Sequence, residues 1–291
     1  MRALVFSIDD AYLLPFKVLW HSLMKTESVP VDTPVFILHE DTLCNDSICD
    51  LTVFFTKYGR VCVFLNAQDF VPDNVPLSHH ISKATYYRLF IASILPKNIT
   101  SVVYLDSDAV VVRSVRDLFE LELTNPLAAA DHFSPGNAFR LWGEQSGTYF
   151  QAGVLVIDLN AWRTAGYEQV FALILRDEAD RILWWDQDVL NIAFKDQWQR
   201  LPVWFNVCNQ VRKELDEQLI QSNACFVHLD GSGKPWKFAG KTPHALQWYE
   251  AYAQCFGQPF NLRAIQRPLW HRLESGVKRS LKYALQELKA I

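Results

Sequence analysis

Two aspartates separated by one residue, Asp106 and Asp108, lie between apolar segments at 101–105 and 109–112. A carboxylate within an apolar segment costs free energy unless it is paired with a charge or bound to a cation. Residues i and i+2 of a strand point to the same side, so both carboxylates could reach one cation. Such oxygen ligands suit Mn²⁺ or Mg²⁺ better than Zn²⁺, which prefers His and Cys. The pair predicts a divalent-cation site, the alternative being a polar turn with both acids in water.

A second group of candidate residues follows a strand-like segment at 224–227. Residues 228–236 read His-Leu-Asp-Gly-Ser-Gly-Lys-Pro-Trp. His228 is a candidate metal ligand, the glycines let backbone N–H groups reach an anion, and Lys234 offers a charge for phosphate. The alternative is a Gly-rich surface turn.

Three further positions are unusual for their surroundings. Ala152-Gly153 precedes a buried strand, where the backbone must approach something closely. Asp186-Gln187-Asp188 opens a helix-like stretch, where an acid can serve simply as an N-cap. Arg88 lies in an otherwise apolar helix and needs an acidic partner or a ligand.

Alternating strand-like and helix-like segments must position these residues. Such alternation predicts an α/β fold, a mainly parallel sheet with helices on both faces, in which ligands bind beyond the carboxyl ends of the strands. Asp9, Asp106 and Asp131 each follow an apolar run, so all three could face one crevice. The predicted strands cover 3–8, 35–38, 61–65, 101–105, 126–130 and 153–157, and the predicted helices cover 12–25, 46–58 and 82–94, the last with Ser82 as N-cap.

Composition narrows the class of protein. The chain has 291 residues, of which 50% are hydrophobic and 21% are charged, as in an ordinary globular domain. A net charge of −4 gives no support for nucleic-acid binding. The N-terminal apolar run ends too early for a signal peptide, and no run is long enough to span a bilayer. The six cysteines lack metal-site spacing, so we expect reduced, mostly buried thiols and a cytoplasmic protein.

The C-terminal segment differs from the rest of the chain. Residues 262–291 contain seven Lys or Arg and two Glu, whereas the preceding residues carry a net charge of −9. Apolar residues recur in this segment at helical spacing, which is typical of a helix that lies on an anionic membrane surface. The alternative is a terminal helix that packs its apolar stripe on the domain. We therefore divide the chain into a domain at 1–261 and a basic amphipathic tail at 262–291.

Six segments, taken together and in this order, resemble the family 8 glycosyltransferases, especially the bacterial lipopolysaccharide and lipooligosaccharide glucosyl- and galactosyltransferases. The resemblance extends from about residue 3 to residue 240. It implies a GT-A fold, a UDP-sugar donor, Mn²⁺ and transfer with retention. The segments are 6–10, 84–89, 104–108, 150–154, 186–188 and 228–236.

The resemblance also implies roles at matching positions. The metal ligands would be Asp106, Asp108 and His228. The donor would contact Ser7, Asp9, Tyr12, Arg88, Asp106, Ser107, Gln151, Ala152, Gly153, Gly231 and Lys234. Catalytic residues would be Gln187, Asp186 and Asp131.

Two details of the pattern bear on mechanism and specificity. Gln187 is an amide and a poor nucleophile, which favours a same-face reaction in which the departing phosphate helps deprotonate the acceptor. Asp186 is the alternative, as a covalent nucleophile. Gln151 stands where close relatives have Asn, and Ala11 where many have Asn, which affects the donor-sugar pocket and a nucleotide contact respectively.

The expected protein is thus a cytoplasmic, peripherally membrane-associated enzyme that moves glucose or galactose from a UDP-hexose to a glycan acceptor. We expect a lipid-linked acceptor or the lipopolysaccharide core, and an anionic membrane surface as the partner of residues 262–291. The alternatives are the same chemistry on a protein or polyol acceptor, and an inactive sugar-nucleotide-binding protein.

Overall fold

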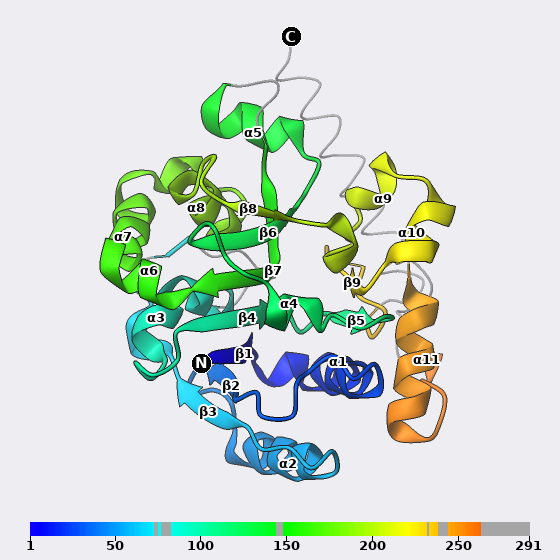
Figure 1. Cartoon of the computed structure of the whole chain (residues 1–291). Coiled ribbons are helices and arrows are strands. Elements are labelled where there is room, and N and C mark those ends of the chain that lie inside the picture. The colour runs from blue at the N-terminus through cyan, green and yellow to red at the C-terminus, as the bar shows by residue number, and fades with distance from the viewer. Residues whose placement is uncertain (73–74, 77–82, 144–147, 232, 238–243, 263–291) are drawn as a thin grey trace, which may run out of the picture.

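A seven-stranded mixed sheet forms the centre of the computed structural model, which describes residues 1–72, 75–76, 83–143, 148–231, 233–237 and 244–262 (Figure 1). The strand order is β3-β2-β1-β4-β7-β6-β8, and β7 alone runs antiparallel to both of its neighbours. The mainly parallel sheet predicted from the alternating pattern is confirmed. The strands are β1 (Arg2–Ser7), β2 (Val35–His39), β3 (Val63–Asn66), β4 (Ser101–Leu105), β6 (Leu127–Asp131), β7 (Phe150–Asp158) and β8 (Gln199–Leu201).

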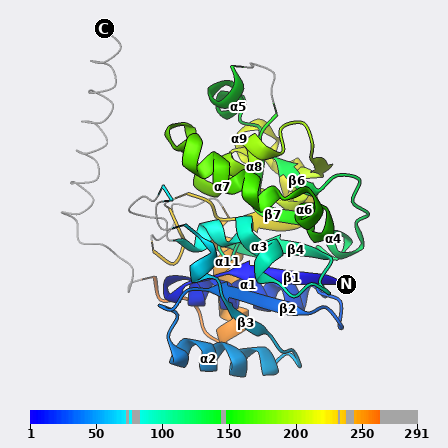
Figure 2. The ribbon, with the colours of Figure 1, turned by 90° about the vertical axis from the view of Figure 1, so that its left-hand side faces the viewer.

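Helices cover both faces of the sheet because successive strand residues point to opposite sides. Ala3 and Val5 of β1 pack in the core beneath α3, α6, α7 and α8, whereas Leu4 and Phe6 pack against α1 and α2. Figure 2 looks onto the first of these faces, with α3, α6 and α7 in front of the strands. The helices are α1 (Leu13–Lys25), α2 (Asn45–Thr56), α3 (Ile91–Ile94), α6 (Leu159–Ala165), α7 (Tyr167–Asp177) and α8 (Trp185–Ala193).

A two-stranded ribbon beside the sheet joins distant parts of the sequence. Strand β5 (Ala109–Val111) pairs antiparallel with β9 (Phe226–His228), and Ala109 lies directly opposite His228. Helix α1 packs against β5 and also against α11 (Ala245–Phe256). This ribbon carries residues separated by more than a hundred positions to one place. The other helices are α4 (Asp117–Glu120), α5 (Pro135–Trp142), α9 (Val211–Glu214) and α10 (Glu217–Asn223).

Several sequence expectations differ from the structure. The helix predicted at 82–94 is a 3₁₀-helix, η3 (Lys83–Phe90), followed by the short α3, and Ser82 lies outside the described residues. Its tighter winding is accompanied by a bond from Arg88 Nε to the carbonyl of Thr85, 3.2 Å away.

The thiols are also placed differently from the expectation. Only Cys208 is buried; the other five are exposed or half-buried, so the expectation of mostly buried cysteines is wrong. Of the predicted tail at 262–291, all but Leu262 lies outside the described residues. Among the described helices, none has the length and apolarity needed to cross a membrane.

Candidate active site

Asp106 and Asp108 flank a bend that joins β4 to β5. The sequence predicted that both side chains point the same way because they lie in one strand. In the structure they lie between two strands, so the pleat of a strand does not bring them together. Backbone bonds fix the bend: the Asp106 N–H donates to the carbonyl of Gly153, 2.8 Å away, and the Leu229 N–H donates to the carbonyl of Asp108, 2.8 Å away. One ligand atom from each aspartate and one from His228 lie within 4.8 Å of one another. The predicted convergence of these three side chains is confirmed.

His228 reaches the two aspartates from the end of β9. Its Nε2 lies 3.1 Å from Asp108 Oδ1 and 3.7 Å from Asp106 Oδ2. The His228 side chain is only 3% exposed, whereas those of Asp106 and Asp108 are 20% and 14% exposed. The cluster is therefore closed on the histidine side and open to solvent on the aspartate side.

Asn206 fixes the orientation of the imidazole. Its Oδ1 lies 3.2 Å from His228 Nδ1, and its Nδ2 donates to Gln151 Oε1. An amide oxygen can only accept, so Nδ1 carries the proton, and in the neutral ring the Nε2 lone pair faces the carboxylates. The fully buried Asn206 is placed there because Val207 bridges to Val227 of β9. Sequence reasoning missed Asn206, since no local pattern marks it.

Gly153 gives the imidazole the space it occupies. A Cβ at this position would lie 2.4 Å from Cε1 and 2.6 Å from Nδ1 of His228, and 2.8 Å from Gln151 Oε1. Such contacts are impossible without displacement of the ring. The close approach predicted for this glycine therefore exists, and the group approached is the side chain of His228.

Lys234 places a positive charge beside Asp108. Its ammonium contacts Asp108 Oδ2 and donates to the Leu229 carbonyl, 2.7 Å away. Burial alone would raise the pKa of Asp108, but Lys234 and His228 together hold it far below its usual range. Burial alone would lower the pKa of His228, but Asp108, Asp106 and Asp230 raise it above 6.5. Two carboxylates and an oriented imidazole form a donor set that suits a divalent cation.

Arg88 has the acidic partners that its position requires. Its guanidinium lies 2.6 Å from Asp106 Oδ1 and 3.0 Å from Asp186 Oδ2, and it donates to the Ala152 carbonyl. Asp186 also accepts from the hydroxyl of Thr85, 2.7 Å away. Burial raises the pKa of Asp186 to about 6 despite its pairing with Arg88. Arg88 thus links the bend between β4 and β5 to the start of α8.

The remaining members of the 186–188 segment have separate contacts. Gln187 Oε1 accepts from the Ala152 N–H, 3.0 Å away, and its Nε2 donates to the hydroxyl of Tyr149, 3.1 Å away. Asp188 accepts from the Leu183 and Trp184 N–H groups and therefore holds the start of α8. The N-cap of α8 is Trp184, and Asp186 and Asp188 lie inside the helix, so the alternative of an acidic N-cap is wrong.

Other predicted donor residues gather near the ends of β1 and β4. Asp9 precedes the 3₁₀ turn η1 (Asp10–Tyr12), Ser7 ends β1, and Ser107 is buried within the bend. The pKa of Tyr12 is raised, first by burial and then by Asp108, Asp9 and Asp106.

The other three predicted positions lie on separate segments. Gly231 adopts φ +78°, a conformation that favours glycine, in the segment between Asp230 and Lys234. Asp131 ends β6, where its Oδ1 accepts from the Phe133 N–H, 2.8 Å away. The side-chain carbonyl oxygen of Gln151 accepts from Asn206 Nδ2 and from the Gly153 N–H. In this structure the amide oxygen of Gln151, which is one methylene longer than Asn, thus contacts groups of the protein.

Comparison with known proteins identifies the fold. The crystal structure of the galactosyltransferase LgtC in complex with donor and acceptor sugar analogues superimposes with a TM-score of 0.76 at 23% identity, covering 91% of this chain and 100% of LgtC. The structure of the glycosyltransferase GlyE of Streptococcus pneumoniae gives a TM-score of 0.64 at 24% identity, covering 91% of this chain and 63% of GlyE. The fold is the GT-A fold expected from the sequence.

Three relatives of known name share 27–28% sequence identity with this chain. General stress protein A of Bacillus subtilis is 27% identical over 66% of this chain and 73% of its own length. A lipopolysaccharide 1,2-glucosyltransferase of Escherichia coli is 28% identical over 69% of this chain and 63% of its own length. A lipopolysaccharide 1,3-galactosyltransferase of Salmonella typhimurium is 27% identical over 70% of this chain and 64% of its own length. The chain thus spans less than two thirds of these two transferases.

The model of one protein family matches most of the chain. Residues 3–240 fit the family described as glycosyl transferase family 8, which agrees with the extent of the resemblance found in the sequence. That range contains all of the site residues described above. The chain therefore belongs to glycosyl transferase family 8.

Proposed function

We propose that this chain is a retaining transferase that moves glucose or galactose from a UDP-sugar to a glycan acceptor with Mn²⁺. One observation carries the proposal: Asp106, Asp108 and His228 converge within 4.8 Å beside the ammonium of Lys234. Mn²⁺ would be held by these three side chains, and Mg²⁺ is the second candidate. The bound cation supplies a positive charge that stabilises the diphosphate as it leaves.

Lys234 supplies a second positive charge. Its ammonium neutralises Asp108 in the structure and lies in the segment that contains Gly231, whose backbone conformation suits approach to an anion. With a cation held by Asp106, Asp108 and His228, Lys234 would be available to contact the diphosphate oxygens. Lys234 would thereby balance part of the negative charge that develops on the leaving phosphate.

The surroundings of Gln187 and Asp186 support the same-face reaction. Both ends of the Gln187 amide are hydrogen-bonded, and an amide is in any case a poor nucleophile. The Asp186 carboxylate is 4% exposed and is engaged by Arg88 and Thr85, so it is weakened as a covalent nucleophile. In this proposal Gln187 stabilises the oxocarbenium-like centre, Arg88 and Asp131 contact the donor sugar, and Asp9 and Ser7 contact uracil.

The test is a screen of UDP-sugars for release of UDP with Mn²⁺, with chelator and with Asp108→Ala. We expect turnover with UDP-glucose or UDP-galactose that depends on the metal and is lost in Asp108→Ala. An inert nucleotide-binding protein would bind UDP and release none from any donor. Full turnover by Asp108→Ala would contradict the metal assignment.

The acceptor is proposed from relatives and from charge. Two relatives are lipopolysaccharide glycosyltransferases, and residues 262–291 carry seven basic residues against two acidic ones. We therefore propose a lipid-linked acceptor at the cytoplasmic membrane surface, with this segment as the basic tail that binds anionic lipid. Co-sedimentation with anionic vesicles should be lost when residues 262–291 are deleted, while UDP release is kept. Equal sedimentation of both proteins would exclude the tail as the membrane contact.

A further inference from the structure

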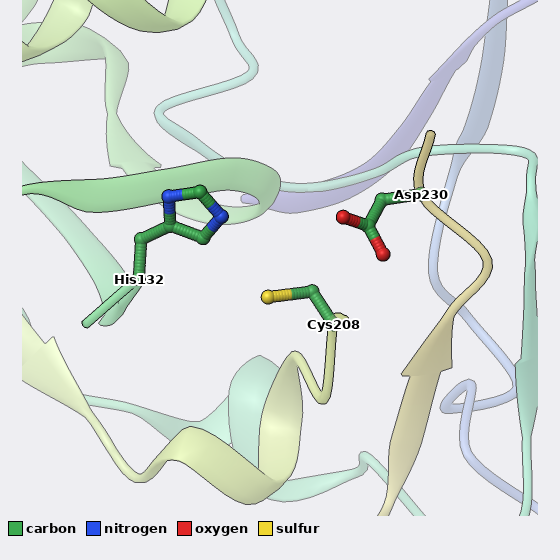
Figure 3. Close-up of side chains that lie close together, drawn as sticks. All are labelled: His132, Cys208 and Asp230. Atoms are coloured by element: carbon green, nitrogen blue, oxygen red, sulfur yellow. The ribbon is translucent and has the colours of Figure 1, made fainter. Parts of the chain in front are cut away.

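A second cluster of metal-ligating side chains lies beyond the residues assigned above. It consists of His132, Cys208 and Asp230, one ligand atom from each lying within 4.8 Å of the others (Figure 3). His132 follows β6, Cys208 follows the Val207 bridge, and Asp230 follows β9, so three separate segments contribute. In Figure 3 the imidazole, the thiol and the carboxylate turn toward a common space.

The chemistry of this cluster differs from that of the first. Asp106, Asp108 and His228 offer mainly oxygen, whereas His132, Cys208 and Asp230 offer one nitrogen, one sulfur and one oxygen. Sulfur and imidazole ligands favour Zn²⁺ over Mn²⁺ and Mg²⁺. Ligand atoms around one tetrahedral zinc lie roughly 3.3–3.8 Å apart, so a contraction of about 1 Å would close the set.

The surroundings of the cluster hold one ligand in place and leave another without a hydrogen-bond partner. Asp230 Oδ1 accepts from the Asn209 N–H, 2.8 Å away, which fixes the carboxylate as an outer partner of a metal ligand does. The buried His132 Nδ1 has no hydrogen-bond partner among the described residues. Burial lowers the pKa of His132, which favours the neutral imidazole that a metal requires.

We propose that His132, Cys208 and Asp230 form a second cation site, selective for zinc and similar soft divalent metals and distinct from the Asp106, Asp108 and His228 site. A metal bound there would tie the end of β6 and the Val207–Cys208 segment to the segment that carries Lys234. The proposal also gives Asp230 a role. It does not depend on the proposed transferase activity, because the two sites share no residue.

Cobalt spectroscopy of the full chain separates the two sites. Mg²⁺ is added in excess to occupy the oxygen-rich site, and Co²⁺ is then titrated while the near-ultraviolet sulfur-to-cobalt charge-transfer band is recorded. We expect wild-type protein to develop the band, Zn²⁺ to abolish it, and Cys208→Ser to lack it. Cys225→Ser is the matched control, because that thiol is half-buried and lies outside the cluster. Cys44 and Cys49 are exposed in all of these proteins and contribute equally.

Asp230→Asn guards against misfolding of Cys208→Ser, since an amide oxygen can still accept from the Asn209 N–H. We expect it to weaken cobalt binding at least about tenfold, and Zn²⁺ to raise the melting temperature of wild type more than that of Asp230→Asn. Identical bands in wild type and Cys208→Ser, or undiminished affinity in Asp230→Asn, would overturn the proposal. Asp108→Ala should keep the band while losing UDP release, so failure of the cation site and failure of the proposed transferase are distinguishable.

Discussion

Replacement of Gly153 by alanine should disable the metal site through a single methyl group. The added Cβ would lie 2.4 Å from His228 Cε1, whereas carbon atoms in contact are separated by about 3.5–4.0 Å. The imidazole must therefore retreat by more than about 1 Å, which breaks its alignment with Asp106 and Asp108. Displacement of this size at a reacting centre costs about 100-fold in rate. That factor corresponds to about 2.7 kcal/mol of lost transition-state stabilisation.

The assay compares kcat/KM for UDP release and Mn²⁺ affinity in wild type, Gly153→Ala and the control Gly136→Ala. Gly136 lies in α5, and a Cβ there meets nothing within 4 Å. We expect both quantities to fall in Gly153→Ala and to be unchanged in Gly136→Ala. Overpacking also costs about 1–3 kcal/mol of stability, so melting curves establish that Gly153→Ala is folded at the assay temperature. A folded Gly153→Ala with wild-type Mn²⁺ affinity would refute the reasoning.

Three other predictions concern His228, its orienting partner Asn206 and the buried Asp188. Asn206→Ala should weaken Mn²⁺ binding by about 10–100-fold in calorimetry, because the proton on His228 Nδ1 loses its acceptor; unchanged affinity would exclude an orienting role. Mn²⁺ affinity should fall as pH is lowered through the raised pKa of His228, because the imidazolium cannot coordinate a metal. Without metal, the stability that comes from protonation of His228 is complete below 6.5 and is lost as pH rises through the raised pKa. A Mn²⁺ dissociation constant that does not change as pH is lowered through this range would contradict the prediction. Asp188→Ala should lower the free energy of unfolding by about 3–5 kcal/mol in denaturant titrations, because it leaves Arg140 and Tyr149 without their buried acceptor. The control is Asp180→Ala, at an exposed position. Equal effects of the two substitutions would exclude a stabilising role for the Asp188 contacts.

Local pattern was sufficient to predict the sheet and the acids at its edge. Apolar runs followed by Asp9, Asp106 and Asp131 indicated strands that end near one another, and β1, β4 and β6 do run in the same direction. Arg88 within an apolar helix indicated an acidic partner or a ligand, and the structure shows two acidic partners, Asp106 and Asp186.

Contacts between distant segments were not predictable in the same way. Pairing of β5 with β9 places His228 opposite Ala109, and no feature of either segment alone specifies that register. Asn206 acquires its contact with His228 only through the Val207 bridge, and the group that Gly153 approaches is 75 residues away in sequence. Cys208 and Asp230 likewise lie beside His132 only because three separate segments end at one place. Side-chain chemistry could be inferred from residue types, but not the orientation that tertiary contacts impose.

Crystals of the chain grown with Mn²⁺ and UDP would test the central claim most directly. Anomalous scattering should show a Mn²⁺ ion within coordination distance of Asp106, Asp108 and His228, with Lys234 turned from Asp108 toward the diphosphate. An ion bound elsewhere, or nucleotide bound with no ion between these three side chains, would contradict the account.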